Sequence, residues 1–242
     1  MDADGVAPTS PCASGVGTVA LHPTREHDES SVTTSAIIPA YNEAPTLGAV
    51  VSTVLRAPCV DEVIVVDDGS TDDTASVGLR SGAHRVLRMG RNHGKGTAVM
   101  RGAEVAAGDC LVLLDGDLLG LCCSHVASLT EPVRGGHADM TVGLLMDGRI
   151  STDLAQALTP GLSGQRAVSR AVLERAHGLD KTSFALEVAL NCWCRRRGGE
   201  VRRVGLPGLS HRWKEEKLGA MAGAWARMRM YWEIVRYRSR SA

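Results

Sequence analysis

Aromatic residues are scarce in this sequence. Phe, Trp and Tyr together make up 3% of the 242 residues, and Phe occurs once. The hydrophobic fraction is nevertheless 44%, so the core has to be built from aliphatic side chains. The length fits one domain of ordinary size with tails.

Long apolar runs and paired cysteine motifs are also lacking. No stretch approaches the roughly 18 apolar residues of a membrane span, and the N-terminus has no basic segment followed by an apolar one, as a signal peptide would. The seven cysteines include no CxxC pair, which favours reduced thiols over a zinc site or a disulfide framework. We therefore expect a cytoplasmic protein without a transmembrane span.

The formal net charge is zero, but the two signs are unevenly distributed. Residues 195–242 carry 13 Lys and Arg against 4 Asp and Glu, a balance of +9, which leaves −9 for residues 1–194. A basic C-terminal end favours an anionic partner, such as a phosphorylated acceptor or a membrane surface. It has no recognisable nucleic-acid-binding motif, so nucleic acid is not an expected partner.

Three segments differ in composition. Residues 1–33 are rich in Ala, Ser, Gly, Thr and Pro without an apolar period, which predicts a disordered tail. Residues 34–213 are expected to form the globular domain. Residues 214–242 predict a basic amphipathic helix. That helix could touch an anionic membrane peripherally, but we favour packing on the domain or pairing two subunits of a homodimer.

Short apolar strands alternate with helices in the first half of the chain. Strands are predicted at 35–38 (stopped by Pro39), 63–66, 85–89 and 111–114. Helices are predicted from Pro45 and at 71–81 and 97–107. This alternation predicts an α/β fold with a doubly wound, mostly parallel sheet and helices on both faces.

The second half is less regular. We expect a strand at 138–145, a loop region at 147–164, helices near 166–177 and at 183–196, and a strand at 200–204.

Polar motifs follow each of the four strands of the first half. They are Tyr41-Asn42-Glu43, Asp67-Asp68-Gly69-Ser70, Asn92 to Gly96, and Asp115-Gly116-Asp117. Ligands of doubly wound sheets bind at the carboxyl ends of the strands. The coincidence therefore predicts one ligand site at this edge of the sheet.

Two carboxylates and one imidazole are candidates for a metal site. Asp115 and Asp117 can both reach a hard divalent cation, which could neutralise a diphosphate leaving group. A neutral His211 would be a suitable third ligand to Mg²⁺ or Mn²⁺. The alternative for the acidic pair is a solvated turn.

Three other residues could carry chemistry. Lys95 lies between two glycines at the start of a helix, where it can meet phosphate, although the spacing is not that of a P-loop. Glu187 interrupts an apolar helix face, which suggests a general base or an acceptor ligand, or else an exposed charge. Asp68 could contact base or ribose, while Asp72 or a neighbour caps the next helix.

Together these motifs resemble the family 2 glycosyltransferases of the GT-A fold, most closely the glucosyl-3-phosphoglycerate synthases and more distantly the dolichyl-phosphate mannose synthases. The motifs are IIPAYNE (37–43), VIVVDDGSTDDT (63–74), GKGTA (94–98), LLDGDL (113–118), LSGQRA (162–167), FALEVAL (184–190) and GLSHRWKEEKLG (208–219). They span about three quarters of the chain.

The resemblance implies a hexosyltransferase that uses a nucleotide-sugar, expected to be UDP-linked, and a site for each substrate. The donor would be held by Pro39, Ala40, Tyr41, Glu43, Asp68, Lys95, Asp115, Gly116 and Asp117. Mg²⁺ or Mn²⁺ would be held by Asp117 and His211. The acceptor would be held by Ser163, Gly164, Gln165 and Arg166, and the catalytic residues would be Glu187, Lys95 and Asp117.

The hydroxyl acceptor stays open at this point, with a small phosphorylated or anionic metabolite as the first expectation. A polyprenyl-phosphate sugar transferase at the membrane surface and a non-catalytic nucleotide-sugar-binding protein are the alternatives. A sugar-nucleotide pyrophosphorylase is not favoured, because it would need a Gly-rich, Arg-containing loop after the first strand, and the sequence there is PAYNE.

Overall fold

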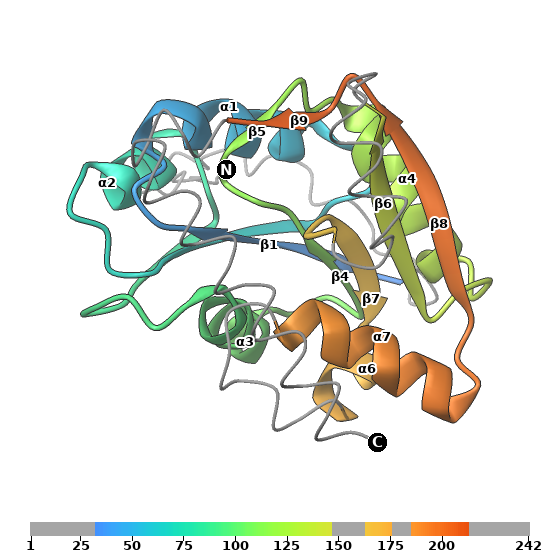
Figure 1. Cartoon of the computed structure of the whole chain (residues 1–242). Helices are drawn as coiled ribbons and strands as arrows, with labels where there is room; N and C mark the ends of the chain where they lie inside the picture. Colours follow the sequence, from blue (N-terminus) through green and yellow to red (C-terminus); the bar gives the residue numbers. More distant parts are fainter. Residues whose placement is uncertain (1–31, 147–162, 176–184, 213–242) are drawn as a thin grey trace, which may run out of the picture. The chain divides into compact units, whose positions relative to one another are not determined.

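The computed structural model describes residues 32–146, 163–175 and 185–212. Its centre is a seven-stranded sheet with the order β3-β2-β1-β4-β7-β6-β8, and a separate ribbon pairs β5 with β9 (Figure 1). The strands are β1 Thr34–Ala40, β2 Glu62–Asp67, β3 Arg85–Arg88, β4 Cys110–Leu113, β5 Leu118–Leu119, β6 Met140–Met146, β7 Arg166–Ser169, β8 Val201–Pro207 and β9 Ser210–His211.

Most neighbouring strands of the large sheet run parallel. β1 pairs parallel with both β2 and β4, β2 with β3, and β6 with β8. β7 is the exception, because it lies antiparallel to β4 on one side and to β6 on the other. The predicted α/β fold with a mostly parallel sheet is thus confirmed, with one reversed strand inside it.

Helices cover both faces of the sheet, as Figure 1 shows. One apolar cluster joins α1 and α4 to one set of strand side chains, and a second joins α3, α6 and α7 to the alternate set. The cores are aliphatic, as the shortage of aromatic residues predicts. The helices are α1 Ala44–Arg56, α2 Thr74–Arg80, α3 Lys95–Val105, α4 Cys123–Arg134, α6 Arg170–Arg175 and α7 Ala185–Arg197.

Two sequence predictions about secondary structure are wrong. Residues 166–169 form strand β7 rather than the start of a helix, because their backbone groups pair with two neighbouring strands. Pro39 lies within β1 instead of stopping it. The β4 ladder on β1 ends at Ile37, so the missing N–H of Pro39 interrupts no bond on that side.

Several boundaries differ, and some elements were not predicted. Helix α2 begins at Thr74, three residues later than expected, and α3 begins at Lys95, two residues earlier. Helix α4 and the ribbon strands β5 and β9 were missed. The ribbon strands contain two residues each, which is too short for a hydrophobic period to reveal.

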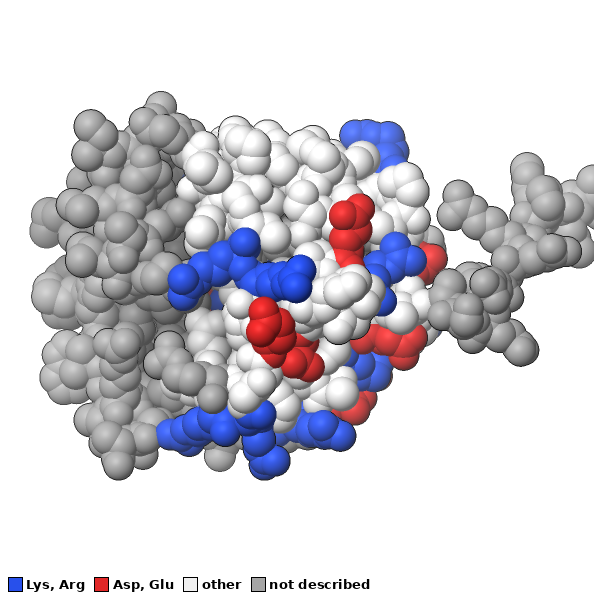
Figure 2. All heavy atoms as spheres, turned by 90° about the vertical axis from the view of Figure 1, so that its right-hand side faces the viewer, with Lys and Arg blue, Asp and Glu red and all other residues white. Residues whose placement is uncertain are grey.

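Strand β8 forms one edge of the large sheet and carries charged side chains. Arg202 and Arg203 are exposed on it, and exposed Glu200 precedes it. Figure 2 looks at this side of the molecule and shows charges of both signs. Charged side chains on an edge strand discourage pairing with another chain.

Three predicted segments lie wholly or largely outside the described ranges. The predicted helix at 214–242 lies wholly outside them. Of the predicted tail at 1–33 only residues 32 and 33 are described, and of the predicted loop at 147–164 only residues 163 and 164. Across the ranges that are described, no helix has the length and apolarity that crossing a membrane requires. The six cysteines within those ranges are free thiols, which agrees with the sequence interpretation.

Candidate active site

The loops after β1 and β2 are joined by hydrogen bonds. The backbone N–H of Asn42, a residue with φ 55°, donates to Ser70 Oγ at 3.0 Å, and its side-chain oxygen accepts from the Thr71 N–H at 2.9 Å. Asp72 accepts the N–H groups of Ala44 at 3.3 Å and Thr74 at 3.0 Å. These bonds hold Tyr41, which is 43% exposed, beside the β2 loop.

Asp68 is buried, and both of its carboxylate oxygens are bonded to backbone N–H groups. Its two carboxylate oxygens accept the N–H groups of His93 and Gly94, each at 2.8 Å. Gly94 is the residue before α3, whose first residue is Lys95. Asp68 therefore sets where α3 begins and where Lys95 stands.

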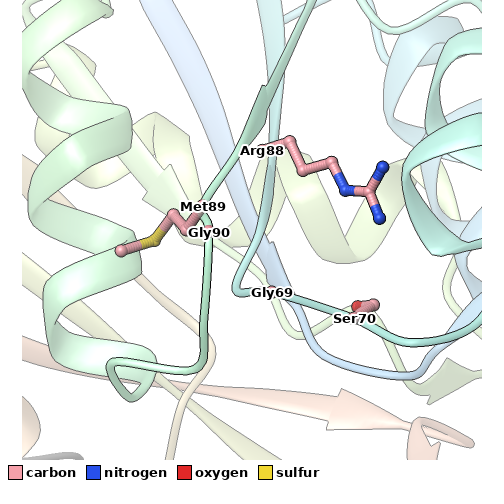
Figure 3. A pocket seen from close by; sticks show the side chains of 5 residues that line it. All are labelled: Gly69, Ser70, Arg88, Met89 and Gly90. Atoms are coloured by element: carbon pink, nitrogen blue, oxygen red, sulfur yellow. The ribbon is translucent and has the colours of Figure 1, made fainter.

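A pocket lies between the ends of β2 and β3. It is lined by Gly69, Ser70, Arg88, Met89 and Gly90 (Figure 3). Figure 3 shows the side chains of Arg88 and Met89 leaving the chain in opposite directions, and Arg88 Nε lies 3.5 Å from the buried carboxylate of Asp67. The pocket was not predicted from the sequence, because its walls come from two separate loops.

Lys95 joins two carboxylates from distant parts of the chain. Its Nζ lies 2.6 Å from Asp115 Oδ1, after β4, and 3.1 Å from Glu187 Oε1, in α7. Glu187 is buried, and within the described residues its Oε2 accepts no hydrogen bond. Of the two sequence interpretations of Glu187, an exposed charge is therefore excluded.

The segment 163–166 packs against this ion pair. Gln165 is buried and its Nε2 donates to Asp115 Oδ2 at 2.9 Å. A Cβ added at Gly164 would stand 2.3 Å from Lys95 Nζ, so a larger residue here would have to displace the Lys95 and Asp115 side chains. Ser163 Oγ donates to Gln165 Oε1 at 3.0 Å, and thus steadies the Gln165 amide.

Arg166 is buried beside the same cluster. Its guanidinium donates to the backbone oxygens of Ser163 at 2.6 Å and Glu187 at 3.5 Å. Burial lowers the pKa of Arg166, while the negative charges of Glu187 and Asp115 oppose that shift. Arg166 thus connects β7 to α7 and adds positive electrostatic potential near the carboxylates of Glu187 and Asp115.

The two-stranded ribbon assembles a possible metal site. Leu118 pairs with His211, and the Arg212 N–H donates to Asp117 O at 3.1 Å. His211 Nδ1 lies 3.1 Å from Asp117 Oδ1, although the two residues are 94 positions apart. Potential ligand atoms of Asp115, Asp117 and His211 all lie within 4.8 Å of one another.

Burial is the largest single influence on the pKa values of Lys95, Asp115 and His211, but neighbouring charges and hydrogen bonds together outweigh it. Burial opposes the charge on Lys95, but Asp115 and Glu187 together raise its pKa well above 10.5. Burial likewise opposes the charge on Asp115, but Lys95 and His211 hold its pKa below 3.8. Burial disfavours protonated His211, but the Asp117 hydrogen bond and the Asp115 charge raise its pKa above 6.5.

The fold places the predicted residues in two groups. The first group, around the β1 and β2 loops, contains Pro39, Ala40, Tyr41, Glu43 and Asp68. The second, around the end of β4, contains Lys95, Asp115, Gly116, Asp117, Ser163, Gly164, Gln165, Arg166, Glu187 and His211. Thr46 links them, because its Oγ1 donates to Gly116 O at 2.9 Å.

Such a site, at the carboxyl ends of parallel strands with an acidic pair and an imidazole, is typical of a transferase of the α/β class. A family model described as glycosyl transferase family 2 matches residues 35–154. The glucosyl-3-phosphoglycerate synthase of Mycobacterium tuberculosis is 29% identical over 227 residues, which cover 78% of this chain and 70% of that protein.

Solved structures agree with the sequence comparisons. The Mycobacterium tuberculosis synthase in complex with Mn²⁺, UDP-glucose and phosphoglyceric acid aligns with a TM-score of 0.66 and 30% identity, covering 78% of this chain and 75% of that one. A dodecaprenyl-phosphate galacturonate synthase of Rhizobium johnstonii is 36% identical over 122 residues, covering 47% of this chain and 36% of that protein.

This chain belongs to glycosyl transferase family 2 and has the GT-A fold. It is a glycosyltransferase, as the order of its motifs predicts.

Proposed function

We propose that this glycosyltransferase moves a hexose from a UDP-sugar to a hydroxyl group of a small phosphorylated or anionic acceptor, with Mg²⁺ or Mn²⁺ bound. The observation that carries the proposal is the shared ion pair of Lys95 with Asp115 and Glu187, which adjoins the Asp115, Asp117 and His211 cluster. Candidate ligands for a cation, a buried carboxylate and its ammonium partner thus lie close together near the end of β4.

The donor's nucleoside would lie across the β1 and β2 loops. The pocket between Gly69 and Arg88 would take the base, and the exposed Tyr41 lies on the neighbouring loop. Pro39 and Ala40 are buried in the strand that carries this loop, so they would shape the wall while Glu43 reaches ribose. The two oxygens of Asp68 already accept backbone N–H groups, which favours a role in holding the loop over direct contact with ribose.

The metal would sit between Asp117 and His211, with Asp115 and the backbone at Gly116 beside it. Two carboxylates and an imidazole fit the ligand preferences of Mn²⁺, and the carboxylates fit those of Mg²⁺. A cation bound there would neutralise the diphosphate that leaves the sugar. His211 has to lose its proton to serve as a ligand, so we expect metal binding to weaken as the pH falls.

Glu187 is the candidate for orienting or deprotonating the acceptor hydroxyl. It is held at one oxygen by Lys95, and its second oxygen, Oε2, accepts no bond within the described residues. A buried carboxylate oxygen without a partner is costly unless a substrate hydroxyl or water donates to it. Lys95 would stabilise negative charge on the donor side while it holds the Glu187 carboxylate in place.

The segment 163–166 supports the acceptor side of the site. Gln165 and Arg166 are buried and bonded within the cluster, which favours positioning Asp115 and α7 over direct acceptor contact. Ser163 and Gly164 are partly exposed, so they are the members of the segment that can meet an acceptor.

Two acceptor classes are supported by similarity. The synthases solved with phosphoglyceric acid favour a small phosphorylated acid. The similarity to the dodecaprenyl-phosphate enzyme, which covers 47% of the present chain, favours a polyprenyl phosphate at a membrane surface. The longer coverage of the first relative is the reason that we put the small acceptor first.

The donor part of the proposal is tested by calorimetry and by released-UDP assays on a panel of nucleotide sugars, with Mn²⁺ and with EDTA. We expect one UDP-hexose to bind only with metal. Asp117→Asn should abolish that binding, whereas Asp73→Asn, the same change at an exposed residue outside the cluster, should leave it intact. Metal-independent binding of every donor would contradict the proposed role of the cluster.

The acceptor is tested with the donor found in that way. A phosphorylated carboxylic acid should accept the sugar in solution, and transfer only to polyprenyl phosphate in detergent or vesicles would favour the second class. The anomeric configuration of the product, read from its proton coupling constants, then decides the role of Glu187. Inversion supports a general base, and retention restricts Glu187 to orienting the acceptor.

A further inference from the structure

His125 is a buried histidine outside the cluster just described. It is the third residue of helix α4, and it is 5% exposed. Its ring is hydrogen-bonded at both nitrogens. Nδ1 accepts the Cys122 N–H at 3.4 Å, which completes a capping box at the start of α4, and Nε2 lies 3.0 Å from the backbone oxygen of Pro207.

These two contacts define the tautomer of the ring. A nitrogen that accepts from an N–H carries no proton, so Nδ1 is the bare nitrogen. A carbonyl oxygen can only accept, so Nε2 must carry the proton and donate it to Pro207 O. Both ring nitrogens of His125 are therefore used, Nδ1 as an acceptor and Nε2 as a donor.

The acceptor of that bond lies at the end of β8, and two residues separate it from the start of strand β9. Pro207 ends β8, and a turn closed by the Leu209 N–H on Leu206 O at 3.4 Å leads to Ser210 and His211. Leu209 is fully buried in the cluster that also contains Val126 of α4. The turn is thus attached to α4 by apolar packing and by one directional bond from His125.

The other ribbon strand passes close to the same turn. A Cβ added at Gly120, which has φ +77°, would lie 2.3 Å from Gly208 O, so the two backbones are in close contact. The ribbon itself has only the pairs Leu118 with His211 and Leu119 with Ser210. A two-stranded ribbon of this length has little stability of its own, so its geometry depends on what holds its ends.

We propose that His125 is a positioning residue for the metal centre: by holding Pro207 O, it fixes the entry of β9 and thereby keeps His211 within reach of Asp115 and Asp117. This rests on the proposed metal site. His125 acts through the turn and touches neither the cation nor a substrate. Partners that orient metal ligands typically change metal affinity by about 10- to 100-fold when removed, and an indirect one belongs at the lower end.

Two nearly isosteric substitutions separate this role from helix capping. Gln and Glu at the third helical position both offer an oxygen to the N-cap N–H, so both preserve the capping box. Only His125→Gln also offers an N–H to Pro207 O, whereas His125→Glu places a second acceptor there. If His125 only capped α4, the two variants would behave alike.

The test measures Mn²⁺ affinity by calorimetry on the full chain, together with amide hydrogen exchange at Arg212, whose N–H bonds Asp117 O. We expect His125→Gln to bind Mn²⁺ within about threefold of wild type, and His125→Glu and His125→Leu to bind about tenfold more weakly. The Arg212 amide should exchange faster in the last two variants, with or without metal. Circular dichroism and the melting temperature establish that each variant is folded.

Equal Mn²⁺ affinity and equal Arg212 exchange in folded His125→Gln and His125→Glu would overturn the positioning role. If wild type itself binds no Mn²⁺, the metal part of the proposed function fails instead. In that case the exchange of Arg212 still decides whether His125 holds the ribbon. A nitrogen-detected spectrum of wild type should show the imidazole proton on Nε2, and a proton on Nδ1 would also contradict the arrangement.

Discussion

Two acidic loops follow parallel strands of one sheet, and their carboxylates are satisfied in different ways. In the loop after β2, Asp68 and Asp72 accept mainly backbone N–H groups. In the loop after β4, Asp115 is bonded by the side chains of Lys95 and Gln165, and Asp117 lies against His211. The sequence presents both loops as similar Asp-rich turns.

The difference predicts that the β2 loop has a structural role and the β4 loop a reactive one. Backbone N–H groups stay where the fold puts them, so carboxylates bonded to them hold loops in place. The ammonium, amide and imidazole groups around Asp115 can exchange their partners for a metal or a phosphate without unfolding the chain. Changes in the β4 loop should therefore act on transfer, and changes in the β2 loop on stability.

The largest expected effect is on catalysis, from Lys95→Gln. Loss of the ammonium removes the positive charge between Asp115 and Glu187, and we expect kcat for sugar transfer to fall by about 100-fold or more. Steady-state kinetics with the preferred donor measure this. Lys95→Arg, which keeps the charge but not the shape, should lose less. A folded Lys95→Gln with kcat within tenfold of wild type would place Lys95 among the structural residues instead.

The next effect is on stability, from Asp68→Ala. The change leaves the N–H groups of His93 and Gly94 without their acceptor, so we expect the free energy of unfolding to fall by about 2–4 kcal/mol. Urea unfolding followed by circular dichroism measures it. Asp68→Asn keeps one oxygen acceptor and should lose roughly half as much. If both variants unfold like wild type but fail to bind the donor, the β2 loop takes part in the reaction. That result would contradict the distinction between the β2 and β4 loops.

The smallest effect is expected from Asp72→Ala, which removes the acceptor at the start of α2 and should cost about 1 kcal/mol. Burial opposes the charge on Asp72, but the bonds from Thr74 and Ala44 together hold its pKa below 3.8. Because the folded pKa is the lower one, this stabilisation is complete above about pH 3.8 and is lost as the pH falls through the folded pKa.

Urea unfolding at a series of pH values tests this prediction. The difference between wild type and Asp72→Ala should shrink below pH 3.8 and stay constant above it. Asp73→Ala is the matched control, since the side chain of Asp73 makes no capping bond to α2. A pH-independent difference would mean that the Asp72 carboxylate contributes through packing rather than charge.

The first half of the sheet was predictable because its information is local. Val63 to Val66 and Leu111 to Leu114 are continuous apolar runs, and such runs mark parallel strands covered on both faces. The same holds for α1, whose apolar spacing and Pro45 identify both its face and its start. Residues 166–169 were misassigned because a four-residue strand carries no period that competes with the helix after it.

The sequence by itself thus determined the class of fold and the four strand ends at which polar motifs gather, and it predicted which residues would hold a metal and a nucleotide-sugar. Only the tertiary structure decided that β7 enters antiparallel beside β4, that Lys95 is shared by Asp115 and Glu187, and that His211 meets Asp117. The hydrophobic periods of strands and helices can be recognised from neighbouring residues, whereas these contacts depend on backbone pairing between segments far apart in the chain. Both His211 and His125 show this, because their partners become visible only once β9 is paired and α4 is packed.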